Sequence, residues 1–272
     1  MRQPFLLFVF FHILSFAGQA QKDSTTGKFF KSHDGTNIYY EVNGKGKPVV
    51  LIHGFMGSSE SWKRAPVYND LLQEGYKVIT VDLRGNGRSD KPHILEAYQN
   101  DAEAKDIIGL MKMLQLKKYS VMGYSRGAII ASRVLVLNKK VSHTVIGGMG
   151  IAFTDTAWSR RKMFYQALMG EPVPELADVM ENIKQNIKKN GLDQLALAYS
   201  QGGQPSTSAK EFSKIKSRVL VICGDKDEDN GKAGELAAII PQANFVTVPG
   251  DHGSALRSKE FSSEVISFLK KE

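Results

Sequence analysis

The sequence predicts an α/β fold, in which a mostly parallel central sheet is flanked by helices and carries one all-helical insertion. Short apolar runs bounded by glycine recur along the chain, as in strands buried on both faces of a parallel sheet. Segments with helical spacing of apolar residues separate several of these runs, and such alternation places helices on both sides of the sheet. From about 151 to 212, helical patterns follow one another without a strand between them.

The strand predictions follow from these runs in order. Two strands are expected within 28–42, with a turn at Asp34 and Gly35, and a second turn at 44–48 is expected to close a plain hairpin. Further strands are predicted at 49–53, 77–82, 119–124, 141–149, 218–224 and 245–249. Helices are predicted at 97–116, 158–169, 176–189, 192–199 and 259–271.

Size and composition favour one globular domain. The 272 residues include 42% hydrophobic and 24% charged residues, which is enough to bury a large core. The net charge of +8 is scattered, whereas a nucleic-acid binder should concentrate its basic residues on one face or stripe. We therefore expect no nucleic-acid partner, and an anionic cell surface or substrate is the weaker alternative. The single cysteine, Cys223, excludes an internal disulfide and a multi-cysteine metal site.

The first 20 residues have the layout of a secretory signal peptide. Arg2 supplies a positive charge, residues 5–16 are almost purely apolar, and Gly18 and Ala20 are small residues suited to a cleavage site before Gln21. The apolar stretch is shorter than the roughly 20 residues that span a bilayer, which disfavours an uncleaved anchor. We expect an exported protein, periplasmic or secreted, whose 21–272 domain is not inserted in a membrane.

The strongest chemical signal is a G-x-S-x-G motif at 123–127, between an apolar strand and a segment that can start a helix. This arrangement is typical of a nucleophile elbow, a sharp turn that exposes a serine hydroxyl. Gly123 and Gly127 leave room for the close backbones that such a turn requires. Ser125 is therefore the candidate nucleophile.

A serine hydroxyl needs a base, and the base needs an acid to fix its tautomer. His252 follows the last predicted strand and is the candidate base, while His33, His93 and His143 are most simply structural. The acidic loop at 224–229 offers two candidates for the acid, and a third aspartate, Asp251, lies next to His252. Asp227 is preferred, Asp225 is the alternative, and Asp251 ranks last because sequence neighbours rarely aim their side chains at each other.

The loop at 53–57 follows the first buried strand and can supply an oxyanion hole. We expect the backbone N–H groups of Phe55 and Arg126 to hold the developing oxyanion, each contributing about 3 kcal/mol to lowering the barrier. The His53 ring is expected to shape the loop rather than to transfer protons. The Arg126 side chain has two open interpretations, binding of an acidic substrate or formation of a buried ion pair.

From 28 to 271 the chain resembles α/β-hydrolase-fold proteins. The H-G-F-M-G loop at 53–57, the elbow, the D-x-R-G-x-G-x-S segment at 82–89, and the late aspartate and histidine all occur in that family's order. The resemblance implies the α/β-hydrolase fold, with a helical lid at about 151–212 inserted after the sixth strand. It also implies that Asp82 and Arg84 brace a glycine-rich turn rather than act in catalysis.

The expected activity is hydrolysis of a carboxylic ester or related acyl bond in a small-molecule substrate, without a metal or organic cofactor. Ser125 disfavours the related epoxide hydrolases and haloalkane dehalogenases, which carry aspartate at this point. Carbon–carbon bond hydrolysis and cofactor-free perhydrolase chemistry use the same three residues, so both remain alternatives. A non-catalytic ligand-binding protein on this scaffold is a further alternative.

The substrate pocket is expected beside Met149 and Phe55, with Trp158 contributed by the lid. Other apolar lid residues have two readings, since they can line the pocket or pack the lid helices onto the body of the protein. Amphipathic spacing alone predicts packing, which is the favoured reading. These residues are Phe153, Met163, Phe164, Leu168 and Met169.

Overall fold

The computed structural model describes residues 27–271. The expected signal peptide at 1–20 lies outside the described residues, so cleavage and export stay predictions. Within the described range, no helix combines the length and the apolar character needed to cross a bilayer.

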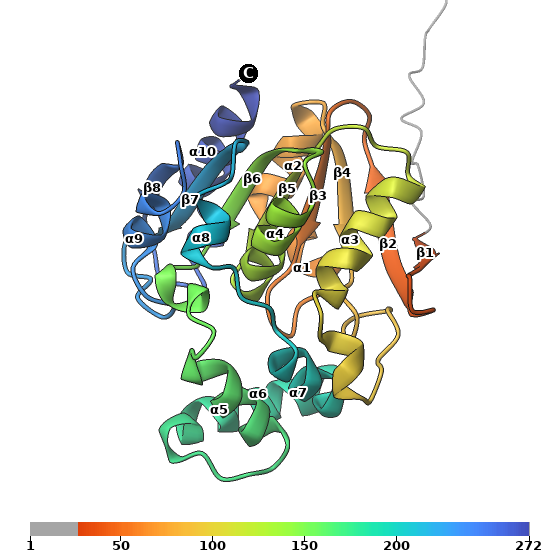
Figure 1. The fold of residues 1–272 in the computed structure, drawn as a ribbon, viewed down its shortest axis with the longest axis vertical. Helices are drawn as coiled ribbons and strands as arrows, with labels where there is room; N and C mark the ends of the chain where they lie inside the picture. Colours follow the sequence, from red (N-terminus) through yellow and green to blue (C-terminus); the bar gives the residue numbers. More distant parts are fainter. Residues whose placement is uncertain (1–26, 272) are drawn as a thin grey trace, which may run out of the picture.

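Eight strands form one sheet in the order β1-β2-β4-β3-β5-β6-β7-β8, which confirms the predicted α/β class (Figure 1). The first two strands are antiparallel to their neighbours, and all other pairs are parallel. The strands are β1 Lys28–Lys31, β2 Asn37–Asn43, β3 Pro48–Ile52, β4 Lys77–Val81, β5 Tyr119–Tyr124, β6 Val141–Gly147, β7 Arg218–Gly224 and β8 Asn244–Val248.

The prediction of a hairpin closed by the turn at 44–48 is wrong. The chain does turn there, but β2 pairs with β4, where Tyr40 lies opposite Val81, and β3 lies between β4 and β5. A local turn reverses the direction of the chain, but it does not determine which strands pair in the sheet. Residues Val49 to Ile52 of β3 are fully buried, and an internal position in the sheet covers both edges and both faces of this apolar strand.

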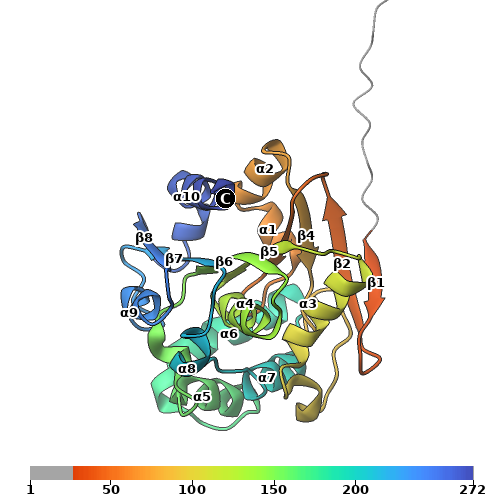
Figure 2. The ribbon, with the colours of Figure 1, turned by 45° about the horizontal axis from the view of Figure 1, so that its top comes forward.

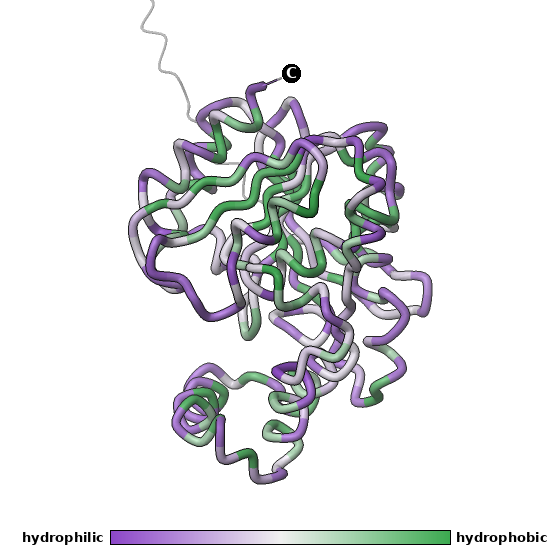
Figure 3. Tube along the Cα trace, turned by 60° about the vertical axis from the view of Figure 1, so that its left-hand side comes forward, coloured by the Kyte–Doolittle hydropathy of each residue, from purple (hydrophilic) through white to green (hydrophobic). Residues whose placement is uncertain are grey.

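Helices cover both faces of the sheet (Figure 2). One face packs against α1 Ser59–Lys63, α2 Pro66–Gln73 and α10 Lys259–Lys270, with Trp62 and Phe261 fully enclosed. The other packs against α3 Ala102–Met113, α4 Arg126–Leu137 and α9 Ala233–Ala238. Figure 3 shows the hydrophobic segments gathered along the strands, with hydrophilic segments outside them.

The helix predicted at 97–116 begins later than expected. Leu95–Tyr98 forms a 3-10 turn, and α3 starts only at Ala102. Asn100 and Asp101 have φ values of 54° and 60°, in the left-handed region that a continuous α-helix cannot contain. The closing helix α10 occupies the predicted segment almost completely.

An all-helical segment connects β6 to β7, and its helices between 159 and 202 lie beyond the carboxyl ends of the strands (Figure 1). Its own apolar cluster, including Phe164, Leu168 and Ile183, packs against Phe55 and Met56 of the loop after β3. This contact fixes the helical segment over that loop. Its elements are the 3-10 turns Ile151–Thr154 and Pro174–Leu176 and the helices α5 Ser159–Leu168, α6 Ala177–Asn190, α7 Gln194–Gly202 and α8 Ala209–Phe212.

Candidate active site

Three loops at the carboxyl ends of β5, β7 and β8 bring Ser125, Asp227 and His252 together. The Ser125 Oγ lies 2.9 Å from His252 Nε2, and Asp227 Oδ2 lies 2.9 Å from His252 Nδ1. Because a carboxylate can only accept, Nδ1 carries the proton that is donated to Asp227. Nε2 is then left with a lone pair that faces the Ser125 hydroxyl.

Ser125 occupies a strained backbone position between β5 and α4. Its φ and ψ are 55° and −127°, a conformation that a residue with a side chain rarely adopts. The flanking glycines permit this turn, since a Cβ on Gly123 would overlap the Gly127 carbonyl and one on Gly127 would overlap the Ile52 carbonyl. The turn leaves the serine half-buried at the start of α4.

Neighbouring groups hold the His252 loop in place. The Tyr124 hydroxyl donates to the His252 carbonyl oxygen at 2.8 Å, and the two rings lie 5.5 Å apart. The Asp227 side chain is only 3% exposed, compared with 26% for His252. A nearly buried carboxylate is thus in contact with an imidazole that remains open to the cavity.

The other two aspartates ranked from the sequence have different contacts. Asp225 Oδ1 accepts from the Gly250 N–H at 2.9 Å, which ties the β7 loop to the β8 loop. Asp251 Oδ1 accepts from the backbone N–H groups of Gly253 and Ser254, so it caps its own turn. Among these three carboxylates, the structure places only Asp227 on the imidazole.

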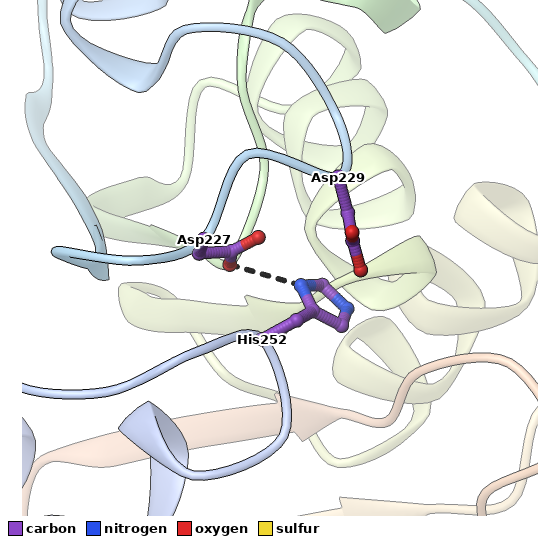
Figure 4. A group of neighbouring side chains, drawn as sticks. All are labelled: Asp227, Asp229 and His252. Atoms are coloured by element: carbon purple, nitrogen blue, oxygen red, sulfur yellow. Dashed lines mark hydrogen bonds and ion pairs between the residues drawn. The ribbon is translucent and has the colours of Figure 1, made fainter.

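Asp229 is an exposed carboxylate that the sequence reasoning did not select. It follows Asp227 in the same loop and points toward the ring of His252 (Figure 4). Asp227, Asp229 and His252 offer ligand atoms within 4.8 Å of one another. A cation held through Nδ1 would move the ring proton to Nε2, and that nitrogen could then no longer accept from Ser125. The group is thus better suited to proton transfer than to metal binding.

The loop after β3 is held by the His53 ring, as expected. His53 Nε2 accepts from the Leu83 N–H at 3.0 Å, so Nδ1 carries the proton and donates to the Gly54 carbonyl at 2.8 Å. Burial lowers the pKa of His53, which favours this neutral form. Within residues 27–271, the Phe55 N–H donates no hydrogen bond, and Arg126 begins α4, where no preceding turn supplies an acceptor.

A cavity of about 690 Å³ lies between these loops and the helical segment. Ser125, His252 and Phe55 line it, and so do the two predicted pocket residues, Met149 and Trp158. The volume is in the range of small-molecule sites. The cavity therefore opens directly onto the serine and the histidine.

The remaining lid residues divide between the two readings. Phe153 is fully buried against Phe212, and Leu168 belongs to the apolar cluster of the lid. Phe164 belongs to that cluster and also lines the cavity. Met163 packs against the same cluster, whereas Met169 is 41% exposed. Packing accordingly accounts for most of this set.

Comparisons with known proteins identify the family. A family model described as the alpha/beta hydrolase fold matches residues 47–176. The AB hydrolase superfamily protein YisY of Bacillus subtilis is 32% identical over 266 residues, which cover 89% of this chain and 98% of that protein. The chain belongs to the α/β-hydrolase superfamily. A putative non-heme chloroperoxidase of a Synechocystis species is 41% identical over 99 residues, which cover 36% of this chain and 34% of that protein.

The solved structures contain the same fold. An esterase from Exiguobacterium antarcticum superposes with a TM-score of 0.73 at 25% identity, over 90% of this chain and 100% of that one. This similarity extends over both the sheet and the helical segment of the α/β hydrolase described here.

The Arg126 side chain of this α/β hydrolase forms a buried ion pair. Its two terminal nitrogens donate to the Glu103 carboxylate at 2.9 and 2.5 Å, and Nη2 also donates to the Ser200 carbonyl at 2.7 Å. Both side chains are at most 4% exposed. Of the two interpretations left open by the sequence, the structure supports the ion pair. The arginine connects the elbow to α3 and to α7.

Asp82 and Arg84 brace the glycine-rich turn, as the resemblance implied. Asp82 accepts from the Ser59 N–H at 2.6 Å and from the Arg88 N–H at 2.8 Å. The fully buried Arg84 donates to both oxygens of Asp106, at 2.7 and 2.6 Å, and pairs with Asp34 at 2.6 Å. Neither side chain lines the cavity.

The histidines outside the site have structural contacts. His33 lies beside the Ser32 hydroxyl, His93 contacts the Asp193 carboxylate at 2.8 Å, and His143 contacts the Lys271 carbonyl at 3.0 Å.

Cys223 is buried, and burial raises the pKa of its thiol to about 11.

Proposed function

We propose that this α/β hydrolase cleaves carboxylic esters by way of an acyl-enzyme on Ser125. The observation that carries the proposal is the continuous relay of two 2.9 Å contacts from Ser125 through His252 to Asp227. Its placement at a strained elbow, facing a small-molecule cavity, gives the hydroxyl access to a substrate. A relative with a solved structure is named an esterase.

In the proposed first step, Ser125 Oγ attacks the ester carbonyl carbon while His252 Nε2 takes its proton. Asp227 holds the proton on Nδ1 and stabilises the imidazolium that forms. The developing oxyanion accepts hydrogen bonds from the Phe55 and Arg126 N–H groups. The imidazolium then gives its proton to the leaving alcohol, and the serine ester remains.

In the second step, water attacks the serine ester and gives its proton to His252 Nε2. The acid is released as Ser125 regains its proton. The two protein groups that transfer protons, Ser125 and His252, both line the cavity, and the reaction needs no net oxidant or reductant. Met149 and Trp158 are proposed to contact the acyl or alcohol group.

The direct test is labelling with a fluorescent fluorophosphonate, which phosphonylates an activated serine. The wild-type protein should label and the Ser125→Ala variant should not. A Ser132→Ala variant serves as a matched control, because Ser132 is a buried serine of α4 that bonds the Ala128 carbonyl. Equal labelling of wild type and Ser125→Ala would contradict the proposal, as would absence of labelling in a folded wild type. The latter result is expected of a non-catalytic binding protein.

Perhydrolase activity is a second candidate, favoured by the relative that is named a putative non-heme chloroperoxidase. In that reaction hydrogen peroxide replaces water in the second step, so that the acyl group leaves as a peracid and Ser125 regains its proton. Assays of short carboxylic acids with peroxide, scored by halide oxidation, would detect this activity. If peracid forms faster than ester is hydrolysed, perhydrolysis replaces hydrolysis as the preferred function.

A further inference from the structure

Arg161 is a half-buried arginine of α5 that lines the same cavity as Ser125. Its Nη2 donates to the carbonyl oxygens of Phe153 and Asp155 at 2.8 and 3.1 Å. Its Nη1 has one long contact, 3.4 Å, to the Gln204 carbonyl, and its enclosed Nε has no acceptor. The guanidinium is thus fixed by backbone dipoles, with part of its donor capacity unused.

Other arginines withdrawn from solvent have carboxylate partners. Arg84 pairs with Asp106, Arg126 with Glu103, and Arg133 with Asp101 and Glu211. Within residues 27–271, no carboxylate oxygen lies within 4.0 Å of the Arg161 guanidinium.

The charge of Asp155 acts on Arg161, but the two side chains form no ion pair. The Asp155 carboxylate instead accepts from the Ala157 N–H at 2.8 Å. Burial lowers the pKa of Arg161, although the charge of Asp155 acts in the other direction. The side chain nevertheless stays charged at neutral pH, because arginine is not deprotonated in proteins. A cation without an ion-pair partner among residues 27–271 therefore lies in the cavity wall.

Most of the other charged residues in the cavity wall are also positive. Three further arginines line the cavity, the exposed Arg64 and Arg257 and the half-buried Arg160, and none of them forms an ion pair among the described residues. Among residues 27–271, Asp229 is the one carboxylate in the lining. Because the Arg161 side chain is half-buried, its charge is partly withheld from water without a carboxylate partner, and an anion entering from solution would reduce the cost of that burial.

We propose that the substrate is an ester that also carries a carboxylate, and that Arg161 binds this carboxylate. The inference rests on the proposed ester hydrolysis and adds the substrate class. The guanidinium geometry suits oxyanions. A carboxylate brings the single negative charge that the Arg161 guanidinium balances. Binding of the remote carboxylate then positions the ester carbonyl at Ser125.

The test compares two esters that differ only in charge, ethyl hydrogen adipate and its neutral amide, ethyl 6-amino-6-oxohexanoate. A second pair carries the carboxylate or amide on the alcohol side, as the acetate esters of 6-hydroxyhexanoic acid and of its amide. Acid release at constant pH gives kcat/KM for each ester. The wild type should prefer the anionic member of at least one pair by tenfold or more.

Variants assign this preference to a residue. Arg161→Gln should reduce the anionic-to-neutral ratio at least tenfold, and Arg161→Lys should retain part of it because the charge remains. Arg218→Gln is the matched control, since Arg218 is exposed at the amino end of β7, away from the cavity, and its ratio should equal that of wild type. A wild-type ratio near one in both pairs overturns the proposal. So does a ratio unchanged in a folded Arg161→Gln or, if that variant fails to fold, in a folded Arg161→Met, which also removes the charge.

A binding measurement separates this proposal from the catalytic one. Calorimetric titration gives the dissociation constant of adipate for the Ser125→Ala protein. In the double variant Ser125→Ala with Arg161→Gln, this constant should be at least tenfold higher. Arg161-dependent binding of adipate without any Ser125-dependent ester turnover would refute the proposed hydrolysis and keep the anion site. Ester turnover without charge preference or adipate binding would refute the anion site and keep the hydrolysis.

Discussion

At the scale of single residues, Asp225 and Asp227 stand two positions apart in one loop and have different contacts. Asp227→Asn should lower kcat by about 10³- to 10⁴-fold, because an amide no longer fixes the proton on His252 Nδ1. Substrate turnover under saturating conditions measures the effect. The change is nearly isosteric, so the melting temperature should move little.

The matched control is Asp225→Asn in the same loop. Its remaining side-chain oxygen still accepts from the Gly250 N–H, so kcat should stay within about threefold of wild type. If Asp225→Asn inactivates the enzyme and Asp227→Asn does not, the acid of the triad is misassigned.

The candidate site residues could be predicted from the sequence because each of them follows a strand with a clear apolar pattern. Ser125, Asp227 and His252 all stand just after apolar runs, and the carboxyl ends of parallel strands meet at one edge of a sheet. Arg161 gave no comparable signal, since an arginine on an amphipathic lid helix reads as solvated surface. Its significance depends on a cavity and on missing counterions, which only the folded chain defines.

At the scale of elements, the elbow depends on glycine at two contacts between backbones. Gly127→Ala would place a methyl group against the carbonyl oxygens of Ile52 and His53, and main-chain atoms cannot yield as a flexible side chain can. We expect the free energy of unfolding to fall by about 3 kcal/mol. Urea denaturation followed by circular dichroism measures this loss.

Gly253→Ala is the control for that substitution. Its added methyl group would meet only the Asp251 side chain, at an ordinary 3.6 Å, and its stability should stay within about 0.5 kcal/mol of wild type. Equal stability of the two variants would show that the close approach at Gly127 is not needed.

The elements also show where a linear pattern stops being informative. Apolar runs located the parallel strands well, because burial on both faces leaves a continuous signature. The same patterns missed the insertion of β4 between β2 and β3, since pairing partners are chosen by the whole sheet. They also predicted one continuous helix over 97–116. The left-handed conformation of Asn100 and Asp101, which interrupts it, depends on the surrounding structure.

At the scale of the whole molecule, the Arg126–Glu103 pair joins the elbow, α3 and the lid. Glu103→Gln leaves a buried guanidinium without its counterion, and we expect the free energy of unfolding to fall by about 3 kcal/mol. The double variant Glu103→Gln with Arg126→Met should regain most of this loss, since no buried charge is then left unpaired. Denaturation of the single and double variants tests the coupling, which would be refuted if their losses simply add.

Export is the last property of the whole molecule that the sequence predicts, and it concerns residues 1–20, outside the described residues. If those residues direct secretion, the full-length chain produced in a bacterial host should be recovered outside the cytoplasm, with Gln21 as its first residue by intact mass. Ala20→Arg should block cleavage, because signal peptidases require a small residue there, whereas Ala20→Ser should be processed normally. Recovery of the unprocessed wild-type chain, Met1 included, from the cytoplasm would contradict the prediction. The positions of Ser125, His252 and Asp227 do not depend on this outcome. Ester hydrolysis measured on the processed and the unprocessed chain therefore tests the proposed activity independently of export.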